Sequence, residues 1–178
     1  MTSSPSIFIG NASIIKKIRF PRNIIPLSIV LQDMIHFILS IPVIIIFLFI
    51  YRKTPSLTWL YGIPILLSLQ LLLTYGTSLI IASTNLFFKD IEKLTIIFTT
   101  FIFYFTPIIY SETIVPDEYK VFIKINPLAP LMISWRELFL NGGLDLSNLL
   151  LCSLYSAVVF IFGYMVYKRL SWRFAEVL

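Results

Sequence analysis

The sequence predicts an all-α integral membrane protein with about four membrane-spanning helices. Of its 178 residues, 58% are hydrophobic and only 13% are charged, whereas soluble domains are about 45–50% apolar and 25% charged. The hydrophobic residues also gather into long runs that are nearly free of charge. A soluble domain of this size would need more polar surface to cover its core, so lipid is the expected solvent.

Three runs meet or approach the length and composition of spans, and one more is shorter but free of charge. A bilayer core about 30 Å thick requires roughly 20 apolar residues of helix. The expected spans are residues 24–50, 60–86, 94–110 and 149–167. The first contains 19 Ile, Leu, Val and Phe residues, which outweigh the cost of about 3 kcal/mol for one intramembrane Asp. Arg52 and Lys53 mark its end, Pro107 marks the exit of the third span, and Lys168 directly follows the fourth.

The segment between the third and fourth runs is different in character. Residues 115–124 carry two acidic and two basic side chains, so this stretch is not expected in hydrocarbon. Residues 126–140 are too short to span comfortably and contain Arg136 and Glu137. We expect a re-entrant or interfacial helix there, with Asn126-Pro127 as its start signal and Gly142-Gly143 as its stop. A fifth full span is the alternative.

The distribution of basic residues predicts an orientation. With the N-terminus inside, nine lie in inner segments (Lys16, Lys17, Arg19, Arg22, Lys89, Lys93, Lys168, Arg169 and Arg173) and five lie in outer segments (Arg52, Lys53, Lys120, Lys124 and Arg136). Cytoplasmic loops carry the excess of Lys and Arg. We therefore expect a multi-pass protein of the inner (plasma) membrane with both termini in the cytoplasm. Since the basic clusters adjoin apolar runs, no nucleic-acid partner is expected.

The motif inventory excludes familiar catalytic classes. No glycine precedes a lysine, so the chain has no Walker A loop with which to hold ATP phosphates. One histidine and one cysteine, Cys152, cannot form a His/Cys metal cluster. The sequence also lacks H-E-x-x-H, G-x-S-x-G and C-x-x-C. We therefore expect that this chain is not an enzyme, has no catalytic residue or metal site, and binds no cofactor.

Residues 11–22 form the most informative polar segment. Ile14, Ile15 and Ile18 recur at near-helical spacing beside a group of basic residues. This pattern is typical of a short amphipathic helix at a membrane surface, and Pro21 breaks it before the first span. Two interpretations remain open at this point: a basic anchor that fixes topology, or a docking element for a cytoplasmic partner.

Five stretches, in order along the chain, resemble ABC type-2 permeases that export O-antigen, capsule and teichoic-acid polymers. They are NASIIKKIRFPRNIIPLS at 11–28, FFKDIEKL at 87–94, FTPIIYSETIVP at 105–116, NPLAPLMISWRELFLNGG at 126–143 and RLSWRFAEVL at 169–178. Each stretch alone is weakly specific, but together they occur in the right order and are distributed over nearly the whole chain, from residue 11 to residue 178. The resemblance implies a transporter permease subunit that moves polysaccharide or lipid-linked glycan outward.

The resemblance also implies partners and coupling residues. Such permeases form a dimer of two copies, here a homodimer, and pair with separate ATPase subunits that bind ATP and Mg²⁺. Their counterpart of residues 11–22 includes a coupling helix that docks on the ATPase. By this resemblance the coupling residues are Asn11, Ile15, Lys16, Lys17, Arg19, Phe20, Arg22, Lys89 and Asp90. Family members have an amphipathic helix and two spans before this loop, so residues 1–178 are expected to be a partial permease domain.

Three pairs of residues are candidates for the glycan path or its outer mouth. Asp33 and His36 lie three residues apart on one helix face, and intramembrane ionisable residues usually face protein interior or a wet path. Tyr104 and Tyr110 lie near the outer end of the third span, where an interfacial aromatic belt is the simpler reading. For Arg136 and Glu137 we favour a structural role that shapes the outer mouth, as we favour a paired polar contact for Asp33 and His36.

Two other functions remain open. A type-2 ABC exporter of drugs or lipids would use the same scaffold, with a broad apolar substrate range. A non-transporting membrane assembly protein, or a truncated remnant, would insert normally without ATP-dependent flux.

Overall fold

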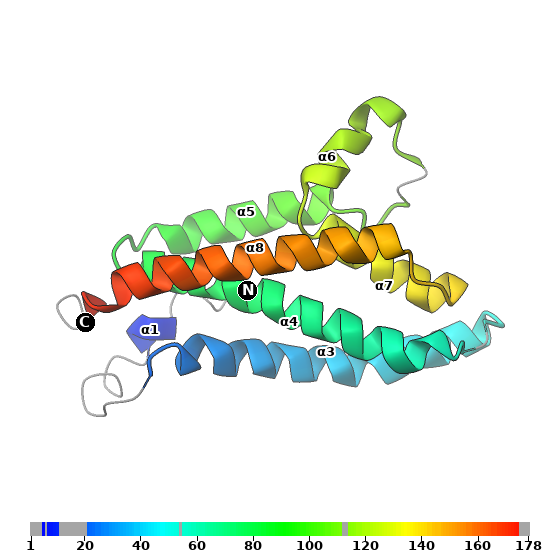
Figure 1. Ribbon diagram of the computed structural model, residues 1–178, viewed down its shortest axis with the longest axis horizontal. Helices are drawn as coiled ribbons and strands as arrows, with labels where there is room; N and C mark the ends of the chain where they lie inside the picture. Colours follow the sequence, from blue (N-terminus) through cyan, green and yellow to red (C-terminus); the bar gives the residue numbers. More distant parts are fainter. Residues whose placement is uncertain (1–4, 6, 11–20, 54, 112–113, 175–178) are drawn as a thin grey trace. The chain divides into compact units, whose positions relative to one another are not determined.

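The computed structural model describes residues 5, 7–10, 21–53, 55–111 and 114–174, and this part of the chain is helical without a strand. Its elements are α1 (Ile7–Gly10), α3 (Ile24–Ile50), α4 (Thr58–Asn85), α5 (Ile91–Phe105), the 3₁₀ helix η2 (Asp117–Tyr119), α6 (Lys120–Ile125), α7 (Ala129–Asn141) and α8 (Leu146–Ser171) (Figure 1). Three of them, α3, α4 and α8, are long and apolar enough to cross a membrane. The predicted all-α membrane fold is confirmed.

The long helices closely follow the apolar runs. Helix α3 has the bounds expected for the first span, and α4 begins two residues before the second run and ends one residue before its end. At the end of α3, Arg52 adopts a left-handed φ of 57°, and the backbone N–H of Lys53 donates to Leu48 O at 2.9 Å. This is the hydrogen bond of a Schellman motif, so the basic pair ends the helix as predicted.

Helix α5 is shorter than the predicted third span. It covers 15 residues, Ile91–Phe105, or about 22 Å at 1.5 Å per residue, and is not among the three helices of spanning length. The helix starts three residues earlier than predicted, and its first turn includes the charged residues Glu92 and Lys93. It ends earlier because Pro107 disfavours helical backbone at the residue before it.

The segment between α5 and α8 contains two short helices where one was expected. Helix α6 precedes α7, and α7 begins three residues later and ends one residue later than the helix predicted at 126–140. The side chain of Asn126 accepts a hydrogen bond from the backbone N–H of Leu128 at 3.0 Å, which forms the predicted start signal. The predicted stop also holds, because Gly142 ends α7 with a left-handed φ of 64°.

The chain divides into two compact units. Unit 1 comprises the described parts of residues 1–33, 71–100 and 157–178, and unit 2 comprises those of residues 34–70 and 101–156. Each of the helices α3, α4, α5 and α8 therefore contributes one end to each unit. In unit 1 a core cluster joins Phe8, Ala82, Leu86 and Phe174, and the ring centroids of Phe8 and Phe174 lie 4.9 Å apart.

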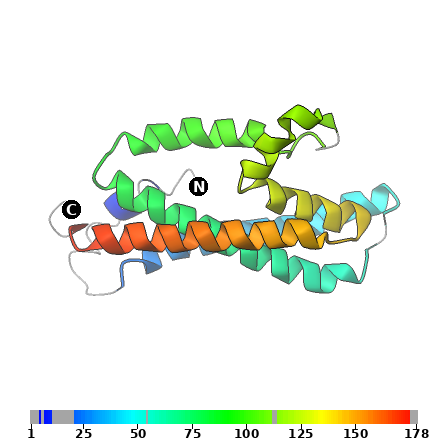
Figure 2. The same cartoon turned by 45° about the horizontal axis from the view of Figure 1, so that its top comes forward.

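Unit 1 is also held by direct backbone contact between α4 and α8, whose ends in this unit lie side by side in both views (Figures 1 and 2). A Cβ placed on Gly76 would lie 2.7 Å from the Cα of Phe160, and one placed on Gly163 would collide with the carbonyl oxygen of Gly76. Only glycine permits this approach, as in other close helix contacts within lipid.

Unit 2 is organised around α7, the most deeply buried helix of this unit. Eight of its thirteen residues are buried, including Leu131, Trp135 and Leu138. At its start, Ala129 and Ile133 pack with Ile123 of α6 in a small core cluster. At its end, Thr58 Oγ1 donates to Gly142 O at 2.6 Å, which ties the beginning of α4 to the end of α7.

Candidate functional site

Of the predicted coupling segment, residues 11–22, the structure describes only residues 21 and 22. Asn11, Ile15, Lys16, Lys17, Arg19 and Phe20 lie outside the described residues. Arg22 is half-buried, and its Nη1 donates to the backbone oxygen of Ser171, the last residue of α8, at 3.0 Å. The last carbonyls of a helix lack intrahelical partners, and a cation there is favoured by the helix dipole. Arg22 therefore anchors the chain entering α3 to the end of α8.

A second hydrogen bond connects the same junction to α4. The hydroxyl of Tyr75 donates to the backbone oxygen of Asn23 at 3.2 Å, and the Tyr75 ring lies 5.8 Å from that of Phe160 on α8. All of these residues belong to unit 1. The entry to α3 is thus connected to two long helices directly after the predicted coupling segment.

Lys89 and Asp90 occupy the loop between α4 and α5. Both side chains are exposed, as is the neighbouring Phe88. The backbone N–H of Ile91 donates to Phe88 O at 3.0 Å, which fixes the turn that presents them. The loop is therefore an accessible surface.

Asp33 and His36 both lie on α3, and both side chains are exposed. Asp33 lies about 10 Å along the helix from Pro26 at 1.5 Å per residue. Their exposure places them on the surface of this chain, toward lipid, water or another subunit.

Tyr104 and Tyr110 are brought together at the end of α5. The hydroxyl of Tyr110 donates to the backbone oxygens of Tyr104 and Phe105 at 3.3 and 3.4 Å, where α5 leaves carbonyls without partners. Tyr104 itself is 66% exposed. Tyr110 therefore has a capping role in this chain, while the ring of Tyr104 is free to face the surroundings.

The residues of the predicted outer segment link α5 to α7. Asn126 Nδ2 donates to Thr106 Oγ1 at 2.8 Å, and Pro127 follows in the turn before the helix. Arg136 Nη2 donates to the backbone oxygens of Pro107 and Ile108 at 2.8 and 2.9 Å. These contacts agree with the structural role favoured for Arg136. Glu137 Oε2 is buried without a hydrogen-bond partner in the described chain.

An aromatic cluster in unit 2 was not anticipated from the sequence. The rings of Trp135 and Phe139 stack at 5.4 Å, and Phe37 and Trp59 each add an edge contact at 5.2 and 5.3 Å. Trp135 Nε1 donates to Gln70 Oε1 at 2.9 Å, and Trp59 Nε1 donates to Leu138 O at 2.8 Å. The i, i+4 spacing of Trp135 and Phe139 was a usable signal, but their partners come from distant helices.

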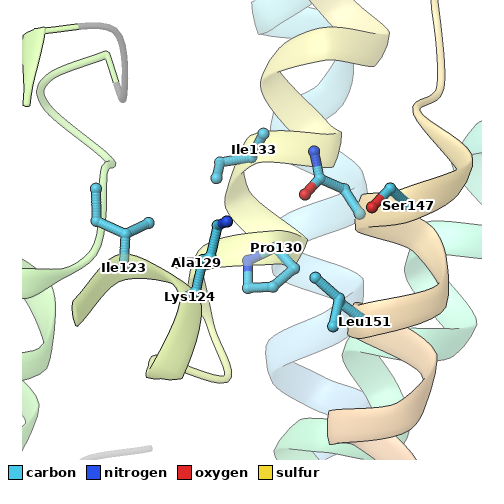
Figure 3. A pocket seen from close by; sticks show the side chains of 8 residues that line it. Ile123, Lys124, Ala129, Pro130, Ile133, Ser147 and Leu151 are labelled. Carbon is cyan, nitrogen blue, oxygen red and sulfur yellow. The ribbon is translucent and has the colours of Figure 1, made fainter. Parts of the chain in front are cut away.

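A cavity of about 200 Å³ lies where α6, α7 and the start of α8 meet. It is lined by Ile123, Lys124, Ala129, Pro130, Ile133, Ser147, Asn148 and Leu151 (Figure 3). The hydroxyl of Tyr155 donates to Lys124 O at 2.7 Å and holds the end of α6 over α8. This cavity was not expected from the sequence, because the three segments that line it carry no shared motif. The described residues hold no group of three His, Cys, Asp or Glu that could bind a metal ion.

Comparison with known proteins identifies the relatives of this chain. No family model matches it. Two O-antigen export system permease proteins RfbA of Klebsiella pneumoniae are 42% and 44% identical to it over 177 residues, which is 99% of this chain and 68% of each relative. An O-antigen export system permease protein RfbA of Myxococcus xanthus is 27% identical over 167 residues, covering 92% of this chain and 64% of that protein.

These matches agree with the resemblance seen in the five sequence stretches. The relatives are named as permeases, which are transporter components rather than enzymes. Three helices of spanning length make the chain a multi-pass membrane protein. The chain belongs to the family of O-antigen export system permeases.

Proposed function

We propose that this chain is a permease subunit of an ATP-driven exporter that moves a polysaccharide of the O-antigen class across the cell membrane, with both termini in the cytoplasm. The observation that carries the proposal is the identity of 42–44% over 99% of the chain to proteins named for O-antigen export. The relatives' names give no support to capsule or teichoic acid as the substrate. They also favour a polysaccharide over the drug or lipid substrates considered from the sequence.

The energy source in this proposal is a separate ATPase subunit that binds ATP and Mg²⁺. The chain has no Walker A loop of its own, and the name "export system permease" describes one component of a larger system. The docking surface would comprise residues 11–22 together with Lys89 and Asp90. Support for the second element comes from the exposure of Lys89 and Asp90.

Movement of the docked segment would reach the membrane helices through the junction at Arg22. This side chain is bonded to the end of α8, and Asn23 is bonded to Tyr75 of α4. A displacement of the segment therefore pulls on two helices at once, rather than on α3 alone. The close backbone contact at Gly76 and Gly163 makes the ends of α4 and α8 in unit 1 move together.

The conduit itself would form with a second copy of the chain. Only 17% of the most apolar part of α3 is buried within this chain, as is 17% of the corresponding part of α8. Large apolar side chains exposed on α3 and α5 include Leu39, Phe47, Phe98 and Phe101. These surfaces must meet lipid or another subunit, and Asp33 and His36 are polar positions where two copies would enclose a wet path.

The coupling proposal is tested by co-purification with an ATPase subunit of the same export system. The double variant Lys16→Glu, Lys17→Glu is expected to retain at least tenfold less ATPase, because its docking charges are reversed. Lys53→Glu is the matched control, since Lys53 is an exposed lysine just beyond the other end of α3. Equal amounts of chain in the membrane fraction establish that insertion is unaffected. Unchanged ATPase binding and stimulation after deletion of residues 11–20 would refute the coupling role.

The transport proposal is tested in cells whose own export permease has been deleted. Expression of this chain with its export-system partners is expected to restore polysaccharide at the cell surface, measured with a polymer-specific antibody. A catalytically inactive ATPase subunit should abolish the signal. Normal insertion with no ATP-dependent polymer at the surface would instead support the non-transporting assembly protein considered from the sequence.

A further inference from the structure

The cavity at the meeting point of α6, α7 and α8 has the features of a small ligand site. Ala129, Pro130 and Ile133 of α7 form its floor, with Lys124 of α6 on one side and Ser147 and Leu151 of α8 on the other (Figure 3). Its volume of about 200 Å³ is below the 300–1,000 Å³ usual for drug-sized ligands. An occupant is therefore limited to a group of about one ring.

The lining combines apolar walls with a few hydrogen-bonding groups. Ile123, Ile133 and Leu151 offer aliphatic surface, while Lys124, Ser147 and Asn148 supply an ammonium, a hydroxyl and an amide. Together these three side chains can both donate and accept hydrogen bonds. A pocket that is mostly apolar with a few convergent polar groups is the usual form of a binding site.

The charges around the cavity argue against an anionic ligand. The start of α8 would ordinarily offer free backbone N–H groups, but Asp145 already accepts from Ser147 N at 3.2 Å and from Asn148 N at 3.4 Å. At the start of α7, Pro130 has no N–H to offer. Lys124 is the one charged side chain in the lining of the cavity, and the carboxylate of Asp145 occupies the start of α8 beside Ser147 and Asn148. The site as a whole favours a neutral ligand.

The mouth of the cavity is open at the surface of the chain. Lys124 and Ser147 are exposed, as are Asp145 and Glu118 nearby in the chain. A ligand joined to a longer chain can therefore enter by one end while the rest remains outside. A neutral sugar ring meets all of these conditions, because one face of the ring carries C–H groups and its rim carries hydroxyls.

We propose that this cavity binds one uncharged sugar residue of the exported polymer, at the end of α8 remote from the C-terminus. The inference rests on the proposed function for the origin of the sugar. The ring's C–H face lies against Ile133 and Leu151, and its hydroxyls bond to Asn148, Ser147 and Lys124. Such a site gives the emerging polymer a holding point beside α7.

The binding test uses the whole chain purified in a detergent without a sugar headgroup. The probes are the methyl glycosides of glucose, galactose, mannose and N-acetylglucosamine, with inorganic phosphate as the anionic alternative. Saturation-transfer NMR is expected to show transfer to the ring protons of at least one glycoside. The double variant Ser147→Ala, Asn148→Ala should weaken that binding about tenfold or more, since each lost hydrogen bond is worth about 0.5–1.5 kcal/mol.

Two further variants discriminate the kind of site. Leu151→Trp fills the cavity and should abolish transfer, whereas Ser153→Ala on the same helix is the control, because its hydroxyl bonds to Leu150 O of its own helix. Lys124→Gln should change glycoside affinity less than about threefold, because the ligand is uncharged. Phosphate binding that Lys124→Gln removes, glycoside binding that Leu151→Trp leaves intact, or no transfer from any glycoside at tens of millimolar would each overturn the proposal.

The export assay separates failure of this inference from failure of the proposed function. Surface polymer restored in the absence of any glycoside binding would refute the sugar site and leave the permease function standing. Glycoside binding by a chain that never restores surface polymer would refute the permease function and leave the sugar site. If both hold, Leu151→Trp is expected to lower surface polymer severalfold while Ser153→Ala does not.

Discussion

The internal contacts of the two units are of different kinds. In unit 1, α4 and α8 meet backbone to backbone at Gly76 and Gly163, where no side chain intervenes. In unit 2, the contacts are made by large side chains: Trp59, Trp135 and Phe139 interlock by their rings, and Arg136 bonds to the turn after α5. At these two glycines the first arrangement leaves no room for a side chain between the helices. The second leaves a cavity beside α7.

The difference follows from the solvent that each arrangement suits. Apolar helices in lipid gain nothing from burying apolar surface against each other, so close van der Waals contact between small residues drives their association. Aromatic residues with a polar N–H suit surroundings where one end is apolar and the other is wet. Under the proposed function, unit 1 would transmit movement as a closely packed pair of helices, and unit 2 would present groups for binding.

The largest effect is expected from Trp135→Ala, which removes the centre of the aromatic cluster in unit 2. The variant loses ring contacts with Phe37 and Phe139 and the hydrogen bond to Gln70. We expect a loss of about 3–5 kcal/mol in the free energy of unfolding, measured by SDS titration with circular dichroism. Trp172→Ala, at a ring that is 63% exposed, is the control. A loss below about 1 kcal/mol would show that the cluster does not hold unit 2.

The corresponding change in unit 1 is Gly163→Ala. Its added methyl group would meet the carbonyl of Gly76, which is backbone and cannot rotate away. Overpacking of this kind costs about 1–3 kcal/mol, and we expect the upper part of that range in the same SDS titration. Gly143→Ala is the matched control, because nothing lies within 4 Å of a Cβ added at that position. Equal stability of the two variants would contradict the backbone contact between α4 and α8.

Variants of Arg136 measure how strongly α7 holds the turn after α5. Arg136→Gln cannot reach both backbone oxygens, those of Pro107 and Ile108, and should lower stability by about 1.5–3 kcal/mol, the usual worth of a charged hydrogen bond. Arg136→Lys should recover only part of this, because lysine lacks the planar fork of arginine. Arg169→Gln, at an exposed position near the end of α8, serves as the reference. Full recovery by lysine would indicate that charge alone matters there.

The smallest effect is expected from Trp59→Phe, which separates ring packing from hydrogen bonding in unit 2. The phenyl ring keeps the edge contact with Phe139, while the hydrogen bond to Leu138 O is lost. We expect a loss of about 1 kcal/mol, the usual worth of one neutral hydrogen bond, and Trp172→Phe should change nothing measurable. A loss as large as that of Trp135→Ala would show that hydrogen bonding, rather than ring packing, makes the larger contribution to the stability of unit 2.

The candidate sites were predictable to different degrees. Asn126 was expected to be part of a start signal for a helix, and its side chain forms a turn with Leu128 just before α7, because the turn chemistry of Asn acts over two residues. Tyr104 and Tyr110 were placed correctly near the end of α5, but the capping bond between them depends on the early end of that helix. A structural role was expected for Arg136, but its hydrogen-bond acceptors were not predicted, because they lie 28 and 29 residues away along the chain.

Composition and the long apolar runs were enough to predict the all-α membrane fold and the approximate position of its long helices, although α8 extends beyond the expected span 149–167 at both ends and includes Lys168 and Arg169. An apolar run long enough to cross lipid must satisfy its backbone hydrogen bonds within itself, so the run is enough to locate the helix. Only the tertiary structure decided that Gly76 meets Gly163, that Arg22 reaches Ser171, and that Lys124 and Asn148 line one cavity. Each of these results depends on which helix faces come together, and that choice is made by packing between residues far apart in the chain.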